Sequence, residues 1–383
     1  MENFRLSDEQ LLIKKLARDF AEKEIRPVAK KLSENKEFPT KIYQQMGELG
    51  LAGVPYPEEY GGGGGSWLSF TIVHEEISRC DPSVANSIMG NSSVCSLLSY
   101  FGTHEQKERW LTPILTGKQI GAIALTEPNA GSDANNLSTT ARLEGDTWVI
   151  NGSKTFISNS GTDITGPIIV AAVTGVDVRG KKQIGTFILP SGTAGLTVGP
   201  QLKKIGFKGN DTHELIFEDC RVPKENLLGD KYKGYRQTLE TISSGRFLIA
   251  AMAVGLAQGC LDQALAYVKE RKVFGKELSN FQNVQFTLSE MATKIELARL
   301  ITYKAAVLKD TNLPFKIEAS MAKLFATKSA MEVAHDAVQL HGGYGIMEEY
   351  DVSRFFGDAK VLEIVEGTNE IQKLIISREL LKG

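Results

Sequence analysis

The residue with the clearest potential for chemistry is a glutamate near the C-terminal end of the chain. Glu366 follows two apolar residues and precedes a glycine. A carboxylate removed from water favours its protonated form, so it becomes a stronger base for taking a proton from a substrate. A second interpretation is open, because Glu363, Glu366 and Glu370 stand three and four residues apart and would share one solvated face of a helix.

Other catalytic and binding motifs are absent or incomplete. The histidines form no H-E-x-x-H pattern and the cysteines no C-x-x-C pair, so we expect no metal site and buried cysteines in a reducing compartment. The segment 175–182 reads G-V-D-V-R-G-K-K, which lacks the Ser or Thr of a phosphate loop and predicts a basic turn. The glycine run 61–65 lacks the third glycine of a dinucleotide fingerprint and predicts a flexible surface loop.

The elements that must position Glu366 follow one another in three blocks. The first block reads helical, because apolar residues recur at helical spacing in the segments 9–31, 40–49, 67–80, 86–101 and 105–115. After Gly121, short β-rich runs are separated by Gly, Pro, Asn and Asp, at 147–150, 155–157, 168–171, 185–189 and 214–217. From Gly234 the chain is helical and alanine-rich again, at 236–271, 280–309, 314–340, 349–357 and 367–381.

The charge balance excludes some classes of partner. Lys plus Arg number 44 and Asp plus Glu 46, so nothing favours binding to nucleic acid or an anionic membrane. The uncharged run 247–261 is about 15 residues, short of the roughly 20 that span lipid, and predicts a buried bundle helix or a subunit contact. The first residues show neither an apolar signal core nor a transit segment, so we expect no membrane insertion and a cytoplasmic protein.

Five segments together resemble the acyl-CoA dehydrogenase family over nearly the whole chain. They read L-T-E-P-N-A-G-S-D at 125–133, K-T-F-I-S-N at 154–159, R-K-V-F-G-K at 271–276 followed by F-Q, Q-L-H-G-G at 339–343 and E-G-T-N-E-I-Q at 366–372. The resemblance implies an α+β fold with an N-terminal α-helical domain (1–120), a middle β-barrel or sandwich domain (121–230) and a C-terminal four-helix-bundle domain (231–383).

The resemblance implies that the chain binds FAD. The turn 126–132 offers backbone N–H groups and hydroxyls to a polar ring edge, although a simple β turn would read the same way. Phe156 can lie against a flavin face, and the fixed cation of Arg271 suits the pyrophosphate. The implied FAD contacts are Leu125, Thr126, Gly131, Ser132, Phe156, Ile157, Ser158, Arg271, Phe274, Gln282, Gln339, Leu340, Gly342, Gly343, Thr368 and Glu370. Because the family takes some of these contacts from a neighbouring subunit, we also expect an oligomer, usually a homotetramer.

The activity that the resemblance implies is α,β-dehydrogenation of an acyl-CoA thioester. Glu366 would take the α proton while the β hydrogen leaves as hydride to flavin N5, and the electrons pass to electron-transfer flavoprotein. Some relatives carry the base just before the arginine matched here by Arg246, but this chain has Gly245 there. The implied substrate contacts are Ser132, Ser243, Arg246 and Gly367.

Two departures from the family pattern bear on the substrate. Ser243 stands where the family often has Asp, so contacts to the CoA arm differ. Val365 stands where straight-chain enzymes commonly have Tyr, which widens the acyl pocket and favours a branched or cyclic acyl group. The segment 86–99 holds no arginine to pair with a distal carboxylate, which disfavours a dicarboxylic substrate. The alternatives are an enoyl-CoA reductase or an acyl-CoA oxidase on the same fold, and a non-catalytic scaffold.

Overall fold

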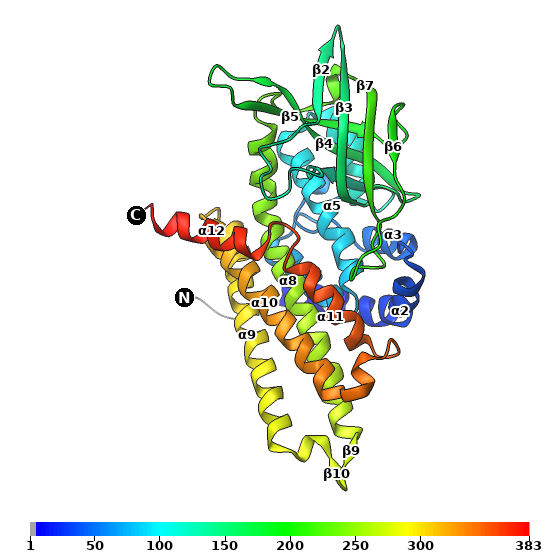
Figure 1. Cartoon of the computed structure of the whole chain (residues 1–383), viewed down its shortest axis with the longest axis vertical. Helices are drawn as coiled ribbons and strands as arrows, with labels where there is room; N and C mark the ends of the chain where they lie inside the picture. The colour runs from blue at the N-terminus through cyan, green and yellow to red at the C-terminus, as the bar shows by residue number, and fades with distance from the viewer. Residues whose placement is uncertain (1–4, 383) are drawn as a thin grey trace.

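The computed structural model describes residues 5–382 and shows three parts in chain order (Figure 1). The N-terminal part is helical, and its main helices are α1 (Asp8–Phe20), α2 (Arg26–Asn35), α3 (Thr40–Glu48), α4 (Trp67–Ser78), α5 (Pro82–Phe101), α6 (His104–Gln106) and α7 (Thr112–Leu115). The single helix expected over 9–31 is interrupted by a π-helical turn at Ala21–Ile25. We predicted from the first residues that the chain has no signal segment, and residues 1–4 of that stretch lie outside the described residues.

The middle part is one mixed sheet with the order β6-β7-β3-β2-β4-β5-β8, and β1 pairs in parallel with β4. Its strands are β1 (Ile120–Ala124), β2 (Thr140–Glu144), β3 (Thr147–Ser158), β4 (Thr165–Val176), β5 (Lys182–Pro190), β6 (Leu196–Val198), β7 (Thr212–Pro223) and β8 (Leu227–Leu228). The two β-rich runs at 147–150 and 155–157 belong to the single strand β3, which pairs with β7 along its length. The basic turn predicted within 175–182 joins β4 to β5.

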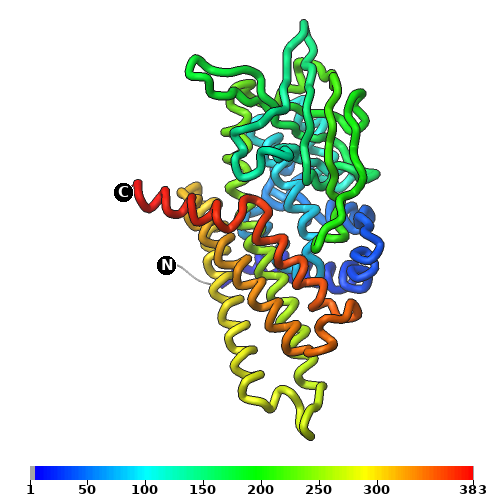
Figure 2. Tube along the Cα trace, in the orientation of Figure 1, coloured from blue at the N-terminus to red at the C-terminus, as the bar shows by residue number. Residues whose placement is uncertain are grey.

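The C-terminal part is a helical bundle that ends, away from the sheet, in the small hairpin β9–β10 (Figure 1). Its elements are α8 (Gly234–Glu270), β9 (Lys272–Val273), β10 (Lys276–Glu277), α9 (Gln282–Asp310), α10 (Lys316–His341), α11 (Asp351–Leu362) and α12 (Asn369–Leu380). Figure 2 shows α12 lying against α10 at the end of the bundle nearest the sheet.

Helix α8 is the common packing partner of the two helical parts. Among the described residues it is the one helix long and apolar enough to cross a membrane, but most of its apolar stretch is buried inside the molecule, as in the core helix of a soluble protein. It packs against α4 so closely that a Cβ added at Gly255 would lie 2.1 Å from the Glu75 carbonyl oxygen. Such contact requires glycine at this position.

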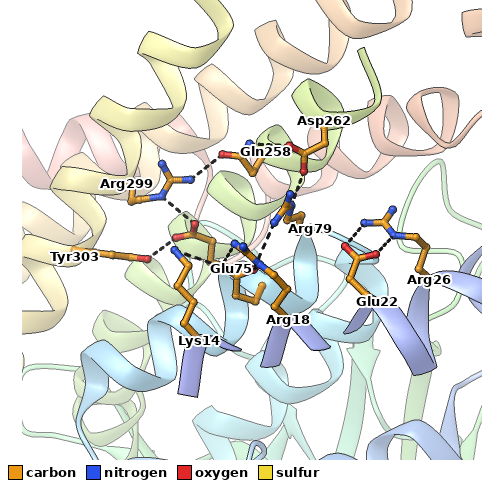
Figure 3. Close-up of polar contacts among 11 residues, drawn as sticks. Lys14, Arg18, Glu22, Arg26, Glu75, Arg79, Gln258, Asp262, Arg299 and Tyr303 are labelled. Atoms are coloured by element: carbon orange, nitrogen blue, oxygen red, sulfur yellow. Dashed lines mark hydrogen bonds and ion pairs between the residues drawn. The ribbon is translucent and has the colours of Figure 1, made fainter. Parts of the chain in front are cut away.

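Buried charges join the N-terminal helices to the bundle. Glu75 on α4 accepts hydrogen bonds from Arg299 Nε at 2.9 Å and from Tyr303 Oη at 2.8 Å, both on α9. The neighbouring Glu76 accepts one from Arg18 Nε of α1 at 2.8 Å. Figure 3 shows how these pairs connect through Lys14, Arg79, Gln258 and Asp262, while Glu22 and Arg26 form a separate pair beside them. Because buried carboxylates need partners, this network fixes the mutual placement of the helices.

The glycine run 61–65 differs from the flexible loop that we predicted. Gly63, Gly64 and Gly65 donate backbone hydrogen bonds to residues 53–56 at 2.8 to 3.0 Å. A Cβ at Gly62 would lie 2.2 Å from the Tyr56 carbonyl oxygen. The glycines therefore allow two chain segments to approach closely, and the loop is held in place by backbone hydrogen bonds.

Candidate active site

Glu366 lies in the turn between α11 and α12 and not on a helix. The interpretation that it shares a solvated helical face with its neighbouring glutamates is therefore wrong. Its backbone is left-handed, with φ of 54°, and Gly367 follows with φ of 90°. This conformation is uncommon for a residue with a side chain and persists only where the surroundings enforce it, which is frequent at functional sites. The turn ends where the Thr368 side chain caps α12 by accepting from Ile371 N–H.

The Glu366 carboxylate is sealed from solvent at one oxygen. Its Oε2 atom is buried and has no hydrogen-bond partner among residues 5–382, although the residue as a whole is half-buried. Burial raises the pKa of Glu366, and the nearby cations of Arg246 and Lys323 oppose that rise only in part. A buried carboxylate with a free oxygen and increased basicity is suited to remove a proton from a bound molecule.

Helix α8 supplies the wall opposite this carboxylate. A Cβ added at Gly245 would lie 2.9 Å from Glu366 Oε2, so the position that the resemblance offered as an alternative place for the base faces this carboxylate. Arg246 follows on α8 and is only 6% exposed. Its Nε and Nη1 atoms are buried without partners in the described part of the chain, which is unusual for a guanidinium group. The unpartnered donors and the unpartnered acceptor indicate a site that a polar ligand completes.

Ser243 lies less than one turn earlier on α8 and lines a groove of about 640 Å³. Tyr100, Phe101, Lys309 and Phe315 contribute to the same groove. The Ser243 hydroxyl donates to the Leu239 carbonyl at 3.1 Å. The structure thus places Ser243 and Arg246 on one helix and brings Glu366 and Gly367 to Arg246 from a separate turn.

The segments predicted to face the flavin ring lie side by side at the sheet. Thr155 N–H donates to the Thr126 carbonyl at 2.9 Å, so the loop after β1 runs along β3. Phe156 has left-handed backbone with φ of 60° and is 69% exposed, whereas Ile157 is buried. The Ser158 hydroxyl lies 3.4 Å from that of Thr212. A left-handed backbone at a bulky residue persists only where the surroundings enforce it, which is frequent at functional sites.

A buried ion pair that sequence reasoning overlooked supports this loop. Lys154 is fully buried, and its Nζ donates to Glu127 Oε1 at 2.7 Å and to the Leu125 carbonyl at 3.0 Å. Glu127 also accepts from the backbone N–H groups of Ser138 and Thr139. Burial lowers the pKa of Lys154 to about 8, despite the hydrogen bond to Glu127. Both residues stood inside the recognised motifs, but only the folded chain shows that they bond each other.

Most of the remaining predicted FAD contacts gather elsewhere, at the far end of the bundle from the sheet (Figure 1). There the Arg271 guanidinium lies over the Tyr344 ring, 5.7 Å from its centroid. Phe274 is 95% exposed, and a Cβ at Gly342 or Gly343 would meet nothing within 4 Å. Gln282, Gln339 and Leu340 border this end, while Thr368 and Glu370 lie at the Glu366 turn. One copy of the chain therefore does not bring the two groups of FAD residues together.

No group of His, Cys, Asp and Glu residues suited to a metal ion occurs within residues 5–382. The four cysteines are free and buried, as predicted. The candidate site thus centres on a buried carboxylate and a buried arginine. A groove lined by Ser243 runs beside α8, and an exposed aromatic and polar surface lies at the sheet.

Comparison with known proteins agrees with this arrangement. Three family models match, described as the acyl-CoA dehydrogenase N-terminal domain (residues 7–118), middle domain (122–220) and C-terminal domain (232–381). The chain is 49% identical over 381 residues to the probable acyl-CoA dehydrogenase YngJ of Bacillus subtilis, covering 99% of this chain and 100% of that protein.

Two solved structures are similar over their full length. Butyryl-CoA dehydrogenase from Megasphaera elsdenii matches with a TM-score of 0.95 and 41% identity, covering 99% of this chain and 100% of the other. A chain in a structure titled for the electron transferring flavoprotein of Acidaminococcus fermentans matches with a TM-score of 0.95 and 43% identity, covering 100% of both.

The chain belongs to the acyl-CoA dehydrogenase family, and it is an oxidoreductase that acts on the CH–CH group of an acyl-CoA. The predicted fold class, with helices, then a sheet, then a helical bundle, is confirmed. Family membership also makes the protein a flavoprotein.

Proposed function

We propose that Glu366 is the base that takes the α proton of an acyl-CoA thioester. The observation that supports this role most directly is its buried, unpartnered Oε2, which faces Gly245 on α8. Burial in this position makes the carboxylate more basic than one in water. The proton next to a thioester is only weakly acidic, so the developing enolate needs donors to its oxygen. The backbone N–H of Glu366 and a hydroxyl of the cofactor's ribityl chain would serve, and such fixed donors contribute several kcal/mol.

FAD is the flavin that we propose for this site, and when bound it supplies the acceptor for the β hydrogen. The loop Leu125–Ser132 and the segment Phe156–Ser158 would hold the ring, because they adjoin each other and present exposed groups. Arg271, Phe274, Gln282 and the segment 339–343 would bind the phosphate and adenine end. Since the two groups lie apart in one chain, the second would serve the FAD of a neighbouring copy. This separation supports a homotetramer, or at least a dimer.

A short acyl chain, with room for a branch, is the substrate class that we propose. The similar butyryl-CoA dehydrogenase supports the short chain. Val365, which packs against the main core without the ring of a tyrosine, supports the extra width. Helix α5 carries no basic side chain, so nothing on it would neutralise a dicarboxylic substrate.

Electron-transfer flavoprotein is the proposed electron acceptor, supported by the full-length similarity to a chain from a structure titled for that protein. A cytoplasmic location is proposed because all four cysteines are free and buried, which suits a reducing compartment.

The variant Glu366→Gln tests the central role. The amide has nearly the same shape, so the purified variant should stay yellow, bind acyl-CoA and fail to reduce its flavin when butyryl-CoA is added without oxygen. Glu34→Gln is the matched control, because Glu34 is an exposed residue of α2 that pairs with Lys30 of the same helix, and it should reduce its flavin at the normal rate. Normal flavin reduction by Glu366→Gln would reject the assignment.

A panel of thioesters tests the substrate class and the alternatives. Butyryl-, isobutyryl-, cyclohexanecarbonyl-, octanoyl- and glutaryl-CoA would be compared for the rate at which they bleach the flavin. A strong preference for octanoyl-CoA would reject the short-chain proposal. Rapid oxidation of the reduced enzyme by O₂ would indicate an oxidase, reduction of an enoyl-CoA with no reverse reaction would indicate a reductase, and no bleaching by any thioester would indicate a scaffold.

A further inference from the structure

Two buried side chains hold the turn that carries Glu366. Lys323 lies outside the recognised motifs, and Gln372 lies inside one of them but had no predicted role. Lys323 on α10 is fully buried. Its Nζ donates to the Glu363 carbonyl at 2.8 Å and to Asn369 Oδ1 at 3.0 Å. The first acceptor ends α11 and the second begins α12, so one ammonium group joins both ends of the turn. The Thr327 hydroxyl supports the same Asn369 oxygen at 3.1 Å.

Gln372 on α12 holds the middle of the turn. Its Nε2 donates to the Gly367 carbonyl at 2.8 Å and to the Glu366 carbonyl at 3.3 Å. These two residues are the ones with left-handed backbone. Gln372 is fully buried, and its Oε1 has no partner in the described chain, so its position is set by these two donated bonds and by packing. A strained backbone persists only when several surrounding contacts enforce it. The hydrogen bonds from Gln372 and Lys323 are such contacts.

Lys323 also places a charge behind the carboxylate. The charged groups that face it are Glu363 from the end of α11, Glu366 from the turn, Glu370 from α12 and Arg246 from α8. Burial lowers the pKa of Lys323 to about 7, partly opposed by the three glutamates. Its positive charge in turn lowers the pKa of Glu366 and so counteracts part of the effect of burial.

We propose that Lys323 and Gln372 are positioning residues for the base: together they hold Glu366 in its left-handed conformation with the carboxylate against Gly245. The proposal rests on the proposed role of Glu366. A base must lie within hydrogen-bond reach of the proton it removes, and a shift of about 1 Å can lower a rate by about 100-fold. Neither side chain needs to touch the substrate for this role.

The test uses three variants of the full-length holoenzyme. Lys323→Met keeps the length of the side chain but removes its charge and both donated bonds. Gln372→Met removes the two donated bonds without changing any charge. Lys304→Met is the control, because Lys304 is an exposed lysine of the neighbouring helix α9 and pairs with Glu318, away from the turn. For each variant, flavin content, melting temperature, kcat, KM for butyryl-CoA, and the pH dependence of kcat/KM would be measured.

We expect Lys323→Met and Gln372→Met to retain flavin and KM but to lose kcat by up to about 100-fold, because the base is misplaced. The acid limb of the pH profile should move to higher pH in Lys323→Met, since the carboxylate loses a neighbouring cation, and should stay in place in Gln372→Met. If the two residues had a purely structural role, their variants would lose flavin or melt at a lower temperature. The pH profiles of Lys323→Met and Gln372→Met would then not differ in the position of the acid limb.

Each result has a definite consequence. Values of kcat for both variants equal to that of Lys304→Met would overturn the proposal. If Lys323→Met does not yield folded holoenzyme, Gln372→Met decides: a reduced kcat at unchanged KM supports the positioning role, and a normal kcat rejects it. Glu366→Gln distinguishes failure of the proposed base from failure of the positioning role. Normal turnover by Glu366→Gln would refute the role of Glu366 as the base. An inactive Glu366→Gln together with unaffected Lys323 and Gln372 variants would refute only the positioning role.

Discussion

Adding one methyl group at Gly245 should slow the reaction without unfolding the protein. The new Cβ of Gly245→Ala would lie 2.9 Å from Oε2 and 3.3 Å from Cδ of Glu366, where ordinary contacts begin at 3.4 Å. The carboxylate must therefore move away by roughly half an ångström, which is the difference between 2.9 Å and the ordinary contact distance of 3.4 Å. Since a 1 Å displacement can reduce a rate by about 100-fold, half that distance corresponds to about tenfold, or about 1.4 kcal/mol in the barrier.

Stability should change in the opposite direction from activity. Gly245 lies inside α8, where alanine is favoured over glycine by about 0.8–1.0 kcal/mol, and the contact is with the end of a side chain that can move. The added methyl also shields the carboxylate further, so the acid limb of kcat/KM should move to higher pH. Anaerobic stopped-flow reduction of the flavin by butyryl-CoA measures the rate, and a thermal melt measures stability.

A second glycine of the same helix provides the control. In Gly255→Ala the new Cβ would lie 2.1 Å from the backbone oxygen of Glu75, which cannot move aside easily. Overpacking of this kind costs about 1–3 kcal/mol, so this variant should melt earlier but reduce its flavin at the normal rate while folded. A normal rate in Gly245→Ala, or equal losses of rate in both variants, would show that residue 245 does not face the reacting carboxylate.

Two further predictions concern buried charges. Lys154→Met leaves Glu127 buried without its cationic partner, which costs about 3–5 kcal/mol, so the variant should lose flavin on gel filtration. The double variant with Glu127→Gln should retain more flavin than Lys154→Met. Full flavin retention by Lys154→Met would contradict this prediction. Asp358 is buried on α11 and accepts from Phe207 N–H at 2.6 Å, and burial raises its pKa from 3.8 to about 7. Because the folded state binds this proton more tightly, the contribution of Asp358 to stability falls as pH rises from about 4 to about 7. Asp358→Asn should therefore melt above the wild type at pH 8, with a difference that shrinks toward pH 4, and a difference independent of pH would contradict the assignment.

The order of elements could be predicted from the sequence because it depends on local patterns. Helical spacing of apolar residues located α4, α5 and the long bundle helices, and β-rich runs located β3, β4, β5 and β7. Strands β1, β2 and β6 carry no separate signal, since they are short and gain their stability from pairing with β4, β3 and β7. The domain limits at 120 and 230 stay predictions.

The candidate site divides in the same way. Motif spacing singled out Glu366, Arg246 and the loop 125–133, but it could not show whether Glu366 lies on a solvated helix or in a buried turn. The structure shows the turn, with φ of 54° at Glu366 and Gly245 directly opposite. Lys323 gave no signal, because it bonds residues 40 and 46 positions away in the sequence. Gln372 stands inside a recognised motif, but only the folded turn shows that it bonds the Glu366 and Gly367 carbonyls.

The sequence alone indicated the kind of protein through the resemblance of five segments to one family, and its periodicity indicated helix or strand, because both depend on local patterns of residues. Only the tertiary structure decided the state of the carboxylate at residue 366. Its basicity depends on how much water is excluded and on which cations lie nearby, and those are set by α8, α10 and α12 packing together across long stretches of chain.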